Sequence, residues 1–117
     1  MSLAEELYDI FYVTQLTRGT ALERLVAVDR VRVEPYRCSQ IHRHMNAETV
    51  LYIESGFGII SVNDVSYEGE KGSRICIPAG AWHGVTTYES DLVFTSVQFR
   101  PIYDAATGRL DLEPLKK

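Results

Sequence analysis

The feature that most constrains this chain is a two-residue alternation of side-chain type that begins near residue 22 and continues to about residue 99. Successive side chains of a β-strand point to opposite faces, so this period is typical of strands buried on one side. Turn residues interrupt the alternation at regular intervals, as in Asn63-Asp64, Lys71-Gly72 and Pro78-Ala79-Gly80. About eight short strands with this spacing favour an all-β sandwich or barrel.

The first of these strands is expected to end by about residue 33, before Pro35-Tyr36, and the others are expected at about 38–43, 48–54, 57–62, 65–67, 73–77, 83–87 and 92–99. Residues 2–11 fit a short helix with a capping box at Ser2 and Glu5. Its apolar face would consist of Leu3, Leu7, Ile10 and Phe11. The run from Phe11 to Thr14 suits a strand equally well. The tail beyond Pro101 has no clear period, and we expect it to dock on the barrel or on a partner.

The length of 117 residues fits a single domain, which we expect to span residues 1–117. An apolar fraction of 45% permits a packed core, and a formal charge of −4 with interspersed signs argues against a nucleic-acid partner. No apolar run approaches the ~20 residues that span a bilayer, and the N-terminus lacks the pattern of an export signal. We therefore expect a cytoplasmic location. Cys38 and Cys76 are too few for a disulfide framework and are expected to be buried, small side chains of strands. A catalytic or redox role is the alternative.

The chain contains three histidines, at positions 42, 44 and 83. His42 and His44 lie two residues apart in an expected strand, so both rings can point into one barrel interior. Glu48 follows where the next strand begins, and His83 begins the strand that returns after the turn at 78–80. Imidazole and carboxylate donors suit divalent transition metals, so these residues predict a site for Mn, Fe, Co, Ni or Zn.

Two segments resemble the motifs of the cupin superfamily. Residues 72–83 match G-x5-P-x-G-x2-H at every fixed position, and residues 42–48 match H-x-H-x3-E. The resemblance covers about residues 24–100 and implies a single-domain, RmlC-like jelly-roll β-barrel, with 1–20 as an N-terminal helix or arm and 101–117 as a tail. It also implies one divalent metal bound by His42, His44, Glu48 and His83. A metal-free ligand pocket is the alternative.

Two positions depart from the family pattern. The family usually has glycine seven positions after its glutamate, but here that position is Ser55, and Gly56 follows it. Either the turn moves by one residue, or a bulge changes the register of the strand and turns Glu48 away from the interior. Thr87 replaces the asparagine that often ends the second motif. Neither change affects a histidine.

Strand parity adds four candidates for the pocket wall, which are Gln40, Tyr52, Ser96 and Gln98. Trp82 is a fifth candidate because it lies beside His83 in the sequence. Gln40 shares a face with the first two histidines, and Tyr52 shares one with Glu48. If Gln98 is inside the barrel its amide needs hydrogen-bond partners, and the alternative is that the face shared by Ser96 and Gln98 meets solvent. Trp82 either stacks on a ligand at the barrel mouth or packs at a contact between subunits.

Three classes of function fit these features. The first is a metal-dependent enzyme of the isomerase or epimerase kind, acting on a small, oxygen-rich molecule such as a sugar, a sugar phosphate or a keto acid. It is favoured because residues 31–56 broadly resemble the mannose-6-phosphate isomerase-like branch of cupins. The second is an iron-dependent dioxygenase, and the third is a non-catalytic module that binds a small molecule. A homodimer is expected, because cupins pair through outer strands and the apolar N-terminal face needs a cover.

Overall fold

The computed structural model describes residues 3–104 and 107–116, and this part of the chain forms β-strands without any helix, so it includes no helix that could cross a membrane. The strands in chain order are β1 (Glu5–Tyr8), β2 (Phe11–Gln15), β3 (Ala27–Val33), β4 (His42–Arg43), β5 (Glu48–Val62), β6 (Val65–Glu70), β7 (Arg74–Ile77), β8 (His83–Phe99), β9 (Tyr103–Asp104), β10 (Arg109–Leu110) and β11 (Glu113–Pro114). The expected all-β class is confirmed. The segments expected at 48–54 and 57–62 merge into β5, and those at 83–87 and 92–99 merge into β8.

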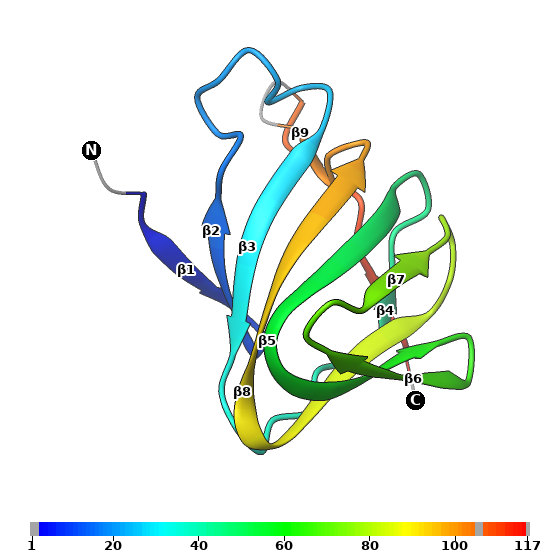
Figure 1. Ribbon diagram of the computed structural model, residues 1–117. Helices are drawn as coiled ribbons and strands as arrows, with labels where there is room; N and C mark the ends of the chain where they lie inside the picture. Colours follow the sequence, from blue (N-terminus) through cyan, green and yellow to red (C-terminus); the bar gives the residue numbers. More distant parts are fainter. Residues whose placement is uncertain (1–2, 105–106, 117) are drawn as a thin grey trace.

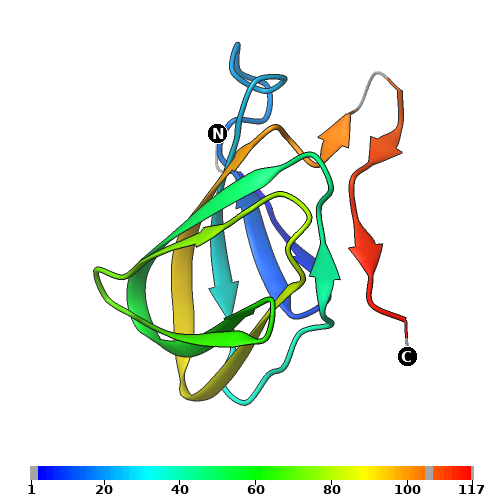
Figure 2. The same ribbon diagram turned by 90° about the vertical axis from the view of Figure 1, so that its right-hand side faces the viewer.

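Two long strands, β5 and β8, organise the sheet. They pair antiparallel from Glu48 opposite Phe99 to Val62 opposite His83. In the sheet, the second half of β8 has β3 as its neighbour, with β2 and β1 beyond it, and the first half of β8 has β4 as its neighbour, with β11 beyond it. β7 pairs with the first half of β5, and β6 pairs with the second half. Figure 1 shows β5 and β8 bending together, and Figure 2 shows the two halves of the sheet facing each other across a barrel interior.

The bend in β5 lies at Gly56. Its φ of +81° is a conformation that residues with a Cβ rarely adopt, and a Cβ there would lie 1.6 Å from the backbone oxygen of Asp91. Register shifts on both sides of it, at Ile53/Ser55 and Gly56/Gly58, mark β-bulges. The bulges change which side chains point inward, because positions 49, 51 and 53 are buried before the bend and positions 58, 60 and 62 are buried after it.

An apolar cluster fills the barrel interior from the bend to the level of the pairs Val62–His83 and Thr49–Ile77. Ile60, Leu92 and Val33 are its most deeply buried side chains. The other members are Val31, Leu51, Ile53, Val62, Ile75, Ile77, Ala81, Val85 and Phe94. Full burial of a side chain such as Leu92 stabilises the fold by about 1.5–3 kcal/mol, so this cluster holds the two halves of the sheet together.

The N-terminal helix predicted for residues 2–11 is wrong in the described part of that range. The chain forms the β1–β2 hairpin instead, with a turn at Asp9, whose φ is +54°. Phe11 pairs with Val33 of β3 and packs against the core, whereas Leu7 on the neighbouring strand is exposed. The alternative expectation of a strand at Phe11–Thr14 is confirmed. Pairing with β3 satisfies the backbone and buries Phe11, which outweighs a capping pattern at the chain start.

The prediction that both cysteines are buried is also wrong. Cys76 lies on the outward face of β7, between the inward Ile75 and Ile77, and Cys38 forms an isolated bridge with Thr86 at the surface. The alternation in Arg74-Ile75-Cys76-Ile77 explains the first case, because two isoleucines bury more apolar area than one thiol. Both thiols are free.

The C-terminal segment docks on the barrel. β11 pairs with β4, where Glu113 lies opposite Arg43 and forms an ion pair with it at 3.0 Å. The N–H of Leu115 donates to the carbonyl of Ile41 at 2.9 Å. Figure 2 shows this segment running beside β4. The tail is therefore part of the wall that carries the first two histidines.

We predict that Gly56→Ala is strongly destabilising, by at least about 3 kcal/mol, because it adds a backbone clash to the cost of positive φ. Gly72→Ala is the matched control: its φ is +90°, and a Cβ there meets nothing within 4 Å, so the cost should be about 1–2 kcal/mol. Urea unfolding of the two variants measures the difference. Equal losses of stability would contradict the role assigned to the contact with Asp91.

Candidate metal site

The three histidines converge inside the barrel from two adjacent strands and the loop that follows one of them. His42 in β4 pairs directly with His83 at the start of β8, and His44 follows β4 by one residue. The ring centroids lie 4.3 Å apart for His42 and His83, and 5.1 Å apart for the other two pairs. One ring nitrogen of each residue lies within 4.8 Å of the corresponding nitrogens of the others. His44 and His83 are buried, and His42 is half-buried.

Each imidazole is held by a backbone carbonyl through its Nδ1 atom. The acceptors are the carbonyls of Gln40 for His42 (3.1 Å), Asp111 for His44 (2.7 Å) and Ala81 for His83 (2.9 Å). A carbonyl oxygen can only accept, so each Nδ1 carries the ring proton and each Nε2 keeps its lone pair. Fixing the tautomer through the second ring nitrogen is the usual arrangement of metal-binding histidines in proteins.

The electrostatics of the three rings favour their neutral form. Burial is the first cause in every case: it lowers the pKa of His42 and of His44, and it lowers the pKa of His83 to about 4, with neighbouring histidines adding to the effect. Neutral imidazoles are the form that binds metal, so no proton has to leave near neutral pH. Three converging, neutral nitrogen donors fit a divalent transition-metal ion.

The C-terminal segment completes the support of His44 through Asp111. Besides its carbonyl, this residue offers both carboxylate oxygens to the loop after His44: they accept the N–H groups of Met45 and Asn46, each at 2.8 Å. Asp111 is a functional residue that no feature of the sequence predicts. No motif signals it, because its role depends on the tail docking beside β4, and the tail shows no periodicity.

The other predicted ligand, Glu48, does not belong to the group of three histidines. It lies on the exposed face of β5, in the same parity as the exposed Tyr52. Both possibilities raised by Ser55-Gly56 are observed: the turn moves by one residue to Gly56, and bulges flank it. Thr49 rather than Glu48 points inward.

The remaining pocket candidates divide between the interior and the surface. Ser96 and Gln98 are buried on the inward face of β8, so the alternative that they meet solvent is wrong. The side chain of Gln40 is exposed, and only its carbonyl serves the site. Trp82 is half-buried on the outside, where Arg43 lies 4.3 Å above its ring and a cavity of about 360 Å³ is lined by Trp82 and five other residues.

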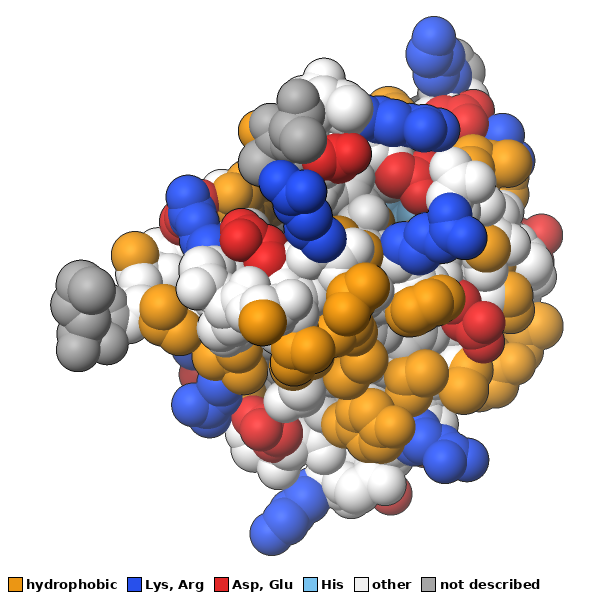
Figure 3. All heavy atoms as spheres, turned by 90° about the horizontal axis from the view of Figure 1, so that it is seen from above, with side chains coloured by type: hydrophobic (Ala, Val, Ile, Leu, Met, Phe, Trp, Pro, Cys, Tyr) orange, Lys and Arg blue, Asp and Glu red, His pale blue; other side chains and the backbone are white. Residues whose placement is uncertain are grey.

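A histidine is visible at the bottom of a hollow when the molecule is seen from above. Figure 3 shows this pale-blue side chain between charged side chains of both signs, on the face opposite the bend at the bottom of Figure 1. Apolar side chains gather beside the hollow in the same view. The site is therefore reached from the open end of the barrel.

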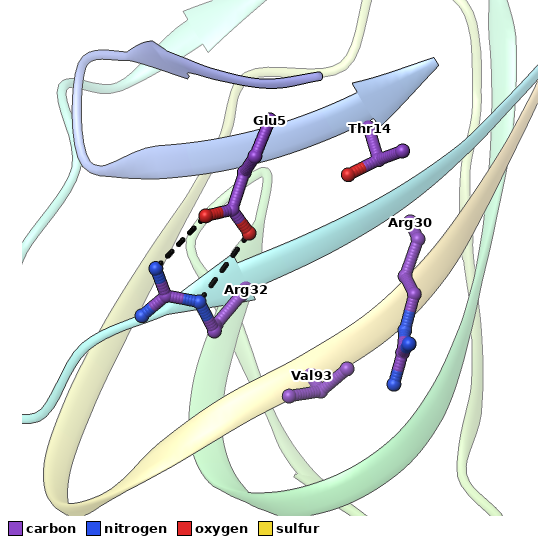
Figure 4. A pocket seen from close by; sticks show the side chains of 5 residues that line it. All are labelled: Glu5, Thr14, Arg30, Arg32 and Val93. Carbon is purple, nitrogen blue, oxygen red and sulfur yellow. Dashed lines mark hydrogen bonds and ion pairs between the residues drawn. The ribbon is translucent and has the colours of Figure 1, made fainter. Parts of the chain in front are cut away.

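A second hollow lies on the outer face of the sheet and has different chemistry. Its volume is about 180 Å³, and Figure 4 shows its lining, which consists of Glu5, Thr14, Arg30, Arg32 and Val93. Both arginines are already paired with carboxylates: Arg32 with Glu5 at 3.0 Å and Arg30 with Glu54 at 3.1 Å. The hollow has no histidine, and its positive charges are neutralised, so we do not assign the metal site to it.

The fold is an antiparallel double-stranded β-helix with three histidines inside its open end. The protein is therefore a jelly-roll barrel with a candidate metal site. The pattern of the Cupin domain family matches residues 29–97, more than half of the chain. The protein belongs to the cupin family, as the two motifs indicated. No curated protein matches the chain.

Several solved structures share this fold. A predicted oxalate decarboxylase from Thermotoga maritima is 17% identical with a TM-score of 0.76, covering 86% of this chain and 95% of its own. A sugar phosphate isomerase of the cupin superfamily from Silicibacter pomeroyi is 17% identical with a TM-score of 0.71, covering 98% and 87%. A double-stranded β-helix protein from Klebsiella pneumoniae is 14% identical with a TM-score of 0.74, covering 98% and 92%. At these identities the likeness describes the fold.

Asp29 brings a titratable carboxyl to the inward face of β3, where it lies opposite the buried Ser96. Burial raises the pKa of Asp29 to about 6 from its ordinary value of 3.8. Between these two values the folded protein holds a proton that the unfolded chain has lost. The stability that this gives at low pH is therefore lost as the pH rises through about 6.

We predict that Asp29→Asn is more stable than the parent protein at pH 8, by about 1 kcal/mol because the carboxyl is partly exposed, and that the difference disappears near pH 4. The histidines titrate equally in both proteins and do not affect the comparison. Thermal unfolding at a series of pH values measures it, with Glu68→Gln on the exposed face of β6 as control. A gain of stability that is constant with pH would refute the assignment to burial of the charge.

Proposed function

We propose that this protein binds one divalent transition-metal ion through His42, His44 and His83 and is a metal-dependent enzyme acting on a small, oxygen-rich molecule. The substrate class is a sugar, a sugar phosphate or a keto acid, and the reaction is of the isomerase or epimerase kind. The observation that carries the proposal is the convergence of three neutral imidazoles, each fixed by its Nδ1 atom, with ring nitrogens within 4.8 Å.

The donor set fits a catalytic ion better than a purely structural one. Three protein ligands leave positions open for substrate or water, whereas structural sites are closed by the protein. A bound ion would supply Lewis acidity that polarises a carbonyl or hydroxyl oxygen. The residues of this chain then serve three purposes: the imidazoles bind, the carbonyls of Gln40, Ala81 and Asp111 orient them, and the surrounding apolar core excludes water from one side.

The names of similar structures are compatible with this substrate class. One is a predicted oxalate decarboxylase and another a sugar phosphate isomerase, and both names refer to small molecules rich in oxygen. A chain of 117 residues offers little additional wall around the barrel, which favours a small ligand.

We predict that His83→Ala weakens binding of Mn(II) or Ni(II) at least 100-fold, because two imidazoles remain of three. Titration calorimetry with protein purified without an affinity tag measures the affinity, and circular dichroism checks the fold. Gln40→Ala is the matched control: it removes an exposed side chain and retains the carbonyl that holds His42, so its affinity should equal that of the parent. Unchanged binding in His83→Ala would exclude His83 from the site.

Turnover assays separate the proposed reaction from the other classes of function. The metal-loaded protein is incubated with aldoses, ketoses, their phosphates and keto acids, and isomerised products are followed by NMR. Isomerisation without oxygen uptake supports the proposal. Oxygen consumption that requires Fe(II) would instead indicate a dioxygenase, and ligand binding without turnover would indicate a binding module.

The proposed assembly is a homodimer, in the cytoplasm. β1 is an edge strand of the sheet, and Leu3, Leu7 and Tyr8 at this edge are exposed. An apolar edge strand is a surface that a second copy can cover. The two free thiols suit a reducing compartment.

We predict that the protein sediments as a dimer and that Leu7→Glu shifts it to monomer with its thermal stability little changed, because this side chain is outside the core. Analytical ultracentrifugation at several concentrations measures the assembly, and Val65→Glu, another exposed apolar position, is the control. A parent protein that is monomeric at all concentrations would refute the dimer.

A further inference from the structure

Two buried side-chain oxygens in the described part of the chain lack a hydrogen-bond partner: Oγ1 of Thr49 and Oε1 of Gln98. The two residues are 3% and 9% exposed. An unsatisfied buried polar group costs about 1–3 kcal/mol, so such groups need an explanation in a folded protein. A ligand that supplies the missing hydrogen bonds is one explanation.

The two oxygens belong to neighbouring residues. Thr49 in β5 lies directly opposite Gln98 in β8, and both side chains are on the inward face of the sheet. This pair is one step from the end of the ladder between the two strands, whose other end is the pair of Val62 and His83. Because β5 and β8 bend between these ends, both ends lie away from the bend, at the open side of the barrel (Figure 1).

The chain segment that follows β7 leads from the neighbourhood of Thr49 to the histidines. Thr49 also pairs with Ile77, the last residue of β7. Three residues later the N–H of Gly80 donates to the carbonyl of His44 at 2.7 Å, and after three more residues the chain reaches His83. The histidines thus lie on the half of the sheet formed by β4 and the start of β8, and the Thr49–Gln98 pair lies on the half that faces it.

The glycine at the bend explains how a hydroxyl comes to lie here. The cupin pattern has its glutamate seven positions before a glycine, and the glycine that the bend requires is Gly56. Counting back from it gives Thr49, not Glu48. Counted from the glycine rather than from the histidines, the position of the family's carboxylate is therefore filled by a neutral hydroxyl.

Further polar residues extend this inward surface along the strands. Ser96 precedes Gln98 on the same face of β8, and Asp29 lies opposite Ser96 on β3. The inward positions beyond them toward the bend, Val31 and Phe94, are apolar. The inward face of β3 and β8 is thus polar near the open end and apolar toward the bend, while Ile77 and Val62 add apolar surface beside Thr49 and His83. This suits a ligand whose polar groups face β3, β5 and β8.

We propose that Thr49 and Gln98 form the hydroxyl-binding side of the histidine site, so that its ligand carries hydroxyl groups next to the oxygen that contacts the metal. The carboxamide oxygen of Gln98 can only accept, so the ligand must donate to it, and the hydroxyl of Thr49 can donate or accept. Hydroxy-carbonyl compounds meet this requirement. Oxalate has no donor at neutral pH and would leave Oε1 of Gln98 unpaired. This inference rests on the proposed metal site.

Three variants test the proposal. Thr49→Val and Gln98→Leu remove the two oxygens with little change of volume, Thr49→Ser restores a hydroxyl, and Glu48→Gln on the outer face of β5 is the matched control. Three quantities are measured for each protein: the Tm without metal, the Kd for Mn(II), and the Kd of the Mn(II)-loaded protein for dihydroxyacetone, D-ribose and oxalate. Calorimetry provides both dissociation constants.

The expected pattern separates ligand binding from metal binding and from folding. Thr49→Val and Gln98→Leu keep or raise the Tm, because an orphaned polar atom is removed, and change the Kd for Mn(II) less than threefold. For the hydroxy-carbonyl probe that the parent protein binds, both variants raise the Kd at least tenfold. Thr49→Ser retains the Kd of the parent for this probe, and Glu48→Gln leaves all three measured quantities unchanged. A lower Tm in both variants would show that the oxygens serve the fold, which overturns the proposal.

The remaining outcomes are equally decisive. A tenfold loss of Mn(II) affinity in Thr49→Val or Gln98→Leu would make these residues metal ligands and overturn the hydroxyl-binding role. If the metal-loaded parent binds oxalate but neither hydroxy-carbonyl compound, or binds none of the three probes, the hydroxyl-binding role is overturned. The proposed metal site is not affected by that result. A parent that binds no Mn(II) at all contradicts the proposed function itself.

Discussion

The close approach of the backbone at Gly56 to the backbone at Asp91 is the contact on which the rest of the structure depends. It allows β5 and β8 to bend together, so that one continuous ladder supplies both walls of the barrel. The accompanying bulges exchange inward and outward positions along β5, and they thereby select Thr49 rather than Glu48 for the interior. A single glycine thus determines the shape of the barrel and the chemistry of its open end.

The histidine site depends on this frame but is tuned locally. The three rings come from positions 42, 44 and 83. A carbonyl two residues earlier orients His42 and His83, whereas the carbonyl of the distant Asp111 orients His44. Burial lowers the pKa of each imidazole, which removes competition between protons and metal near neutral pH. Burying a charged side chain at this site would cost desolvation free energy, and neutral imidazole donors avoid that cost.

Much of this arrangement could be predicted from the sequence because it depends on patterns between residues that are close together in the chain. The alternation of side chains gave the strands, the turn at Asn63-Asp64 has the positive φ values expected of it, and the two motifs identified the three histidines. The helix at the N-terminus was wrong because the hairpin is stabilised by pairing with β3, which lies outside any local window. The sequence could not show whether Glu48 points inward, because a bulge adds one residue to a strand and its only sign in the sequence is the displaced Gly56. Asp111 was missed because its role arises from a contact between residues far apart in the chain.

The dependence of His44 on Asp111 also bears on the order in which the parts of the molecule form. The carbonyl that holds this ring lies 67 positions after it, whereas the strands that enclose the apolar core are complete by Phe99. The ring of His44 acquires its fixed tautomer only when the C-terminal segment docks beside β4. The complete histidine centre therefore requires the tail as well as the strands of the barrel.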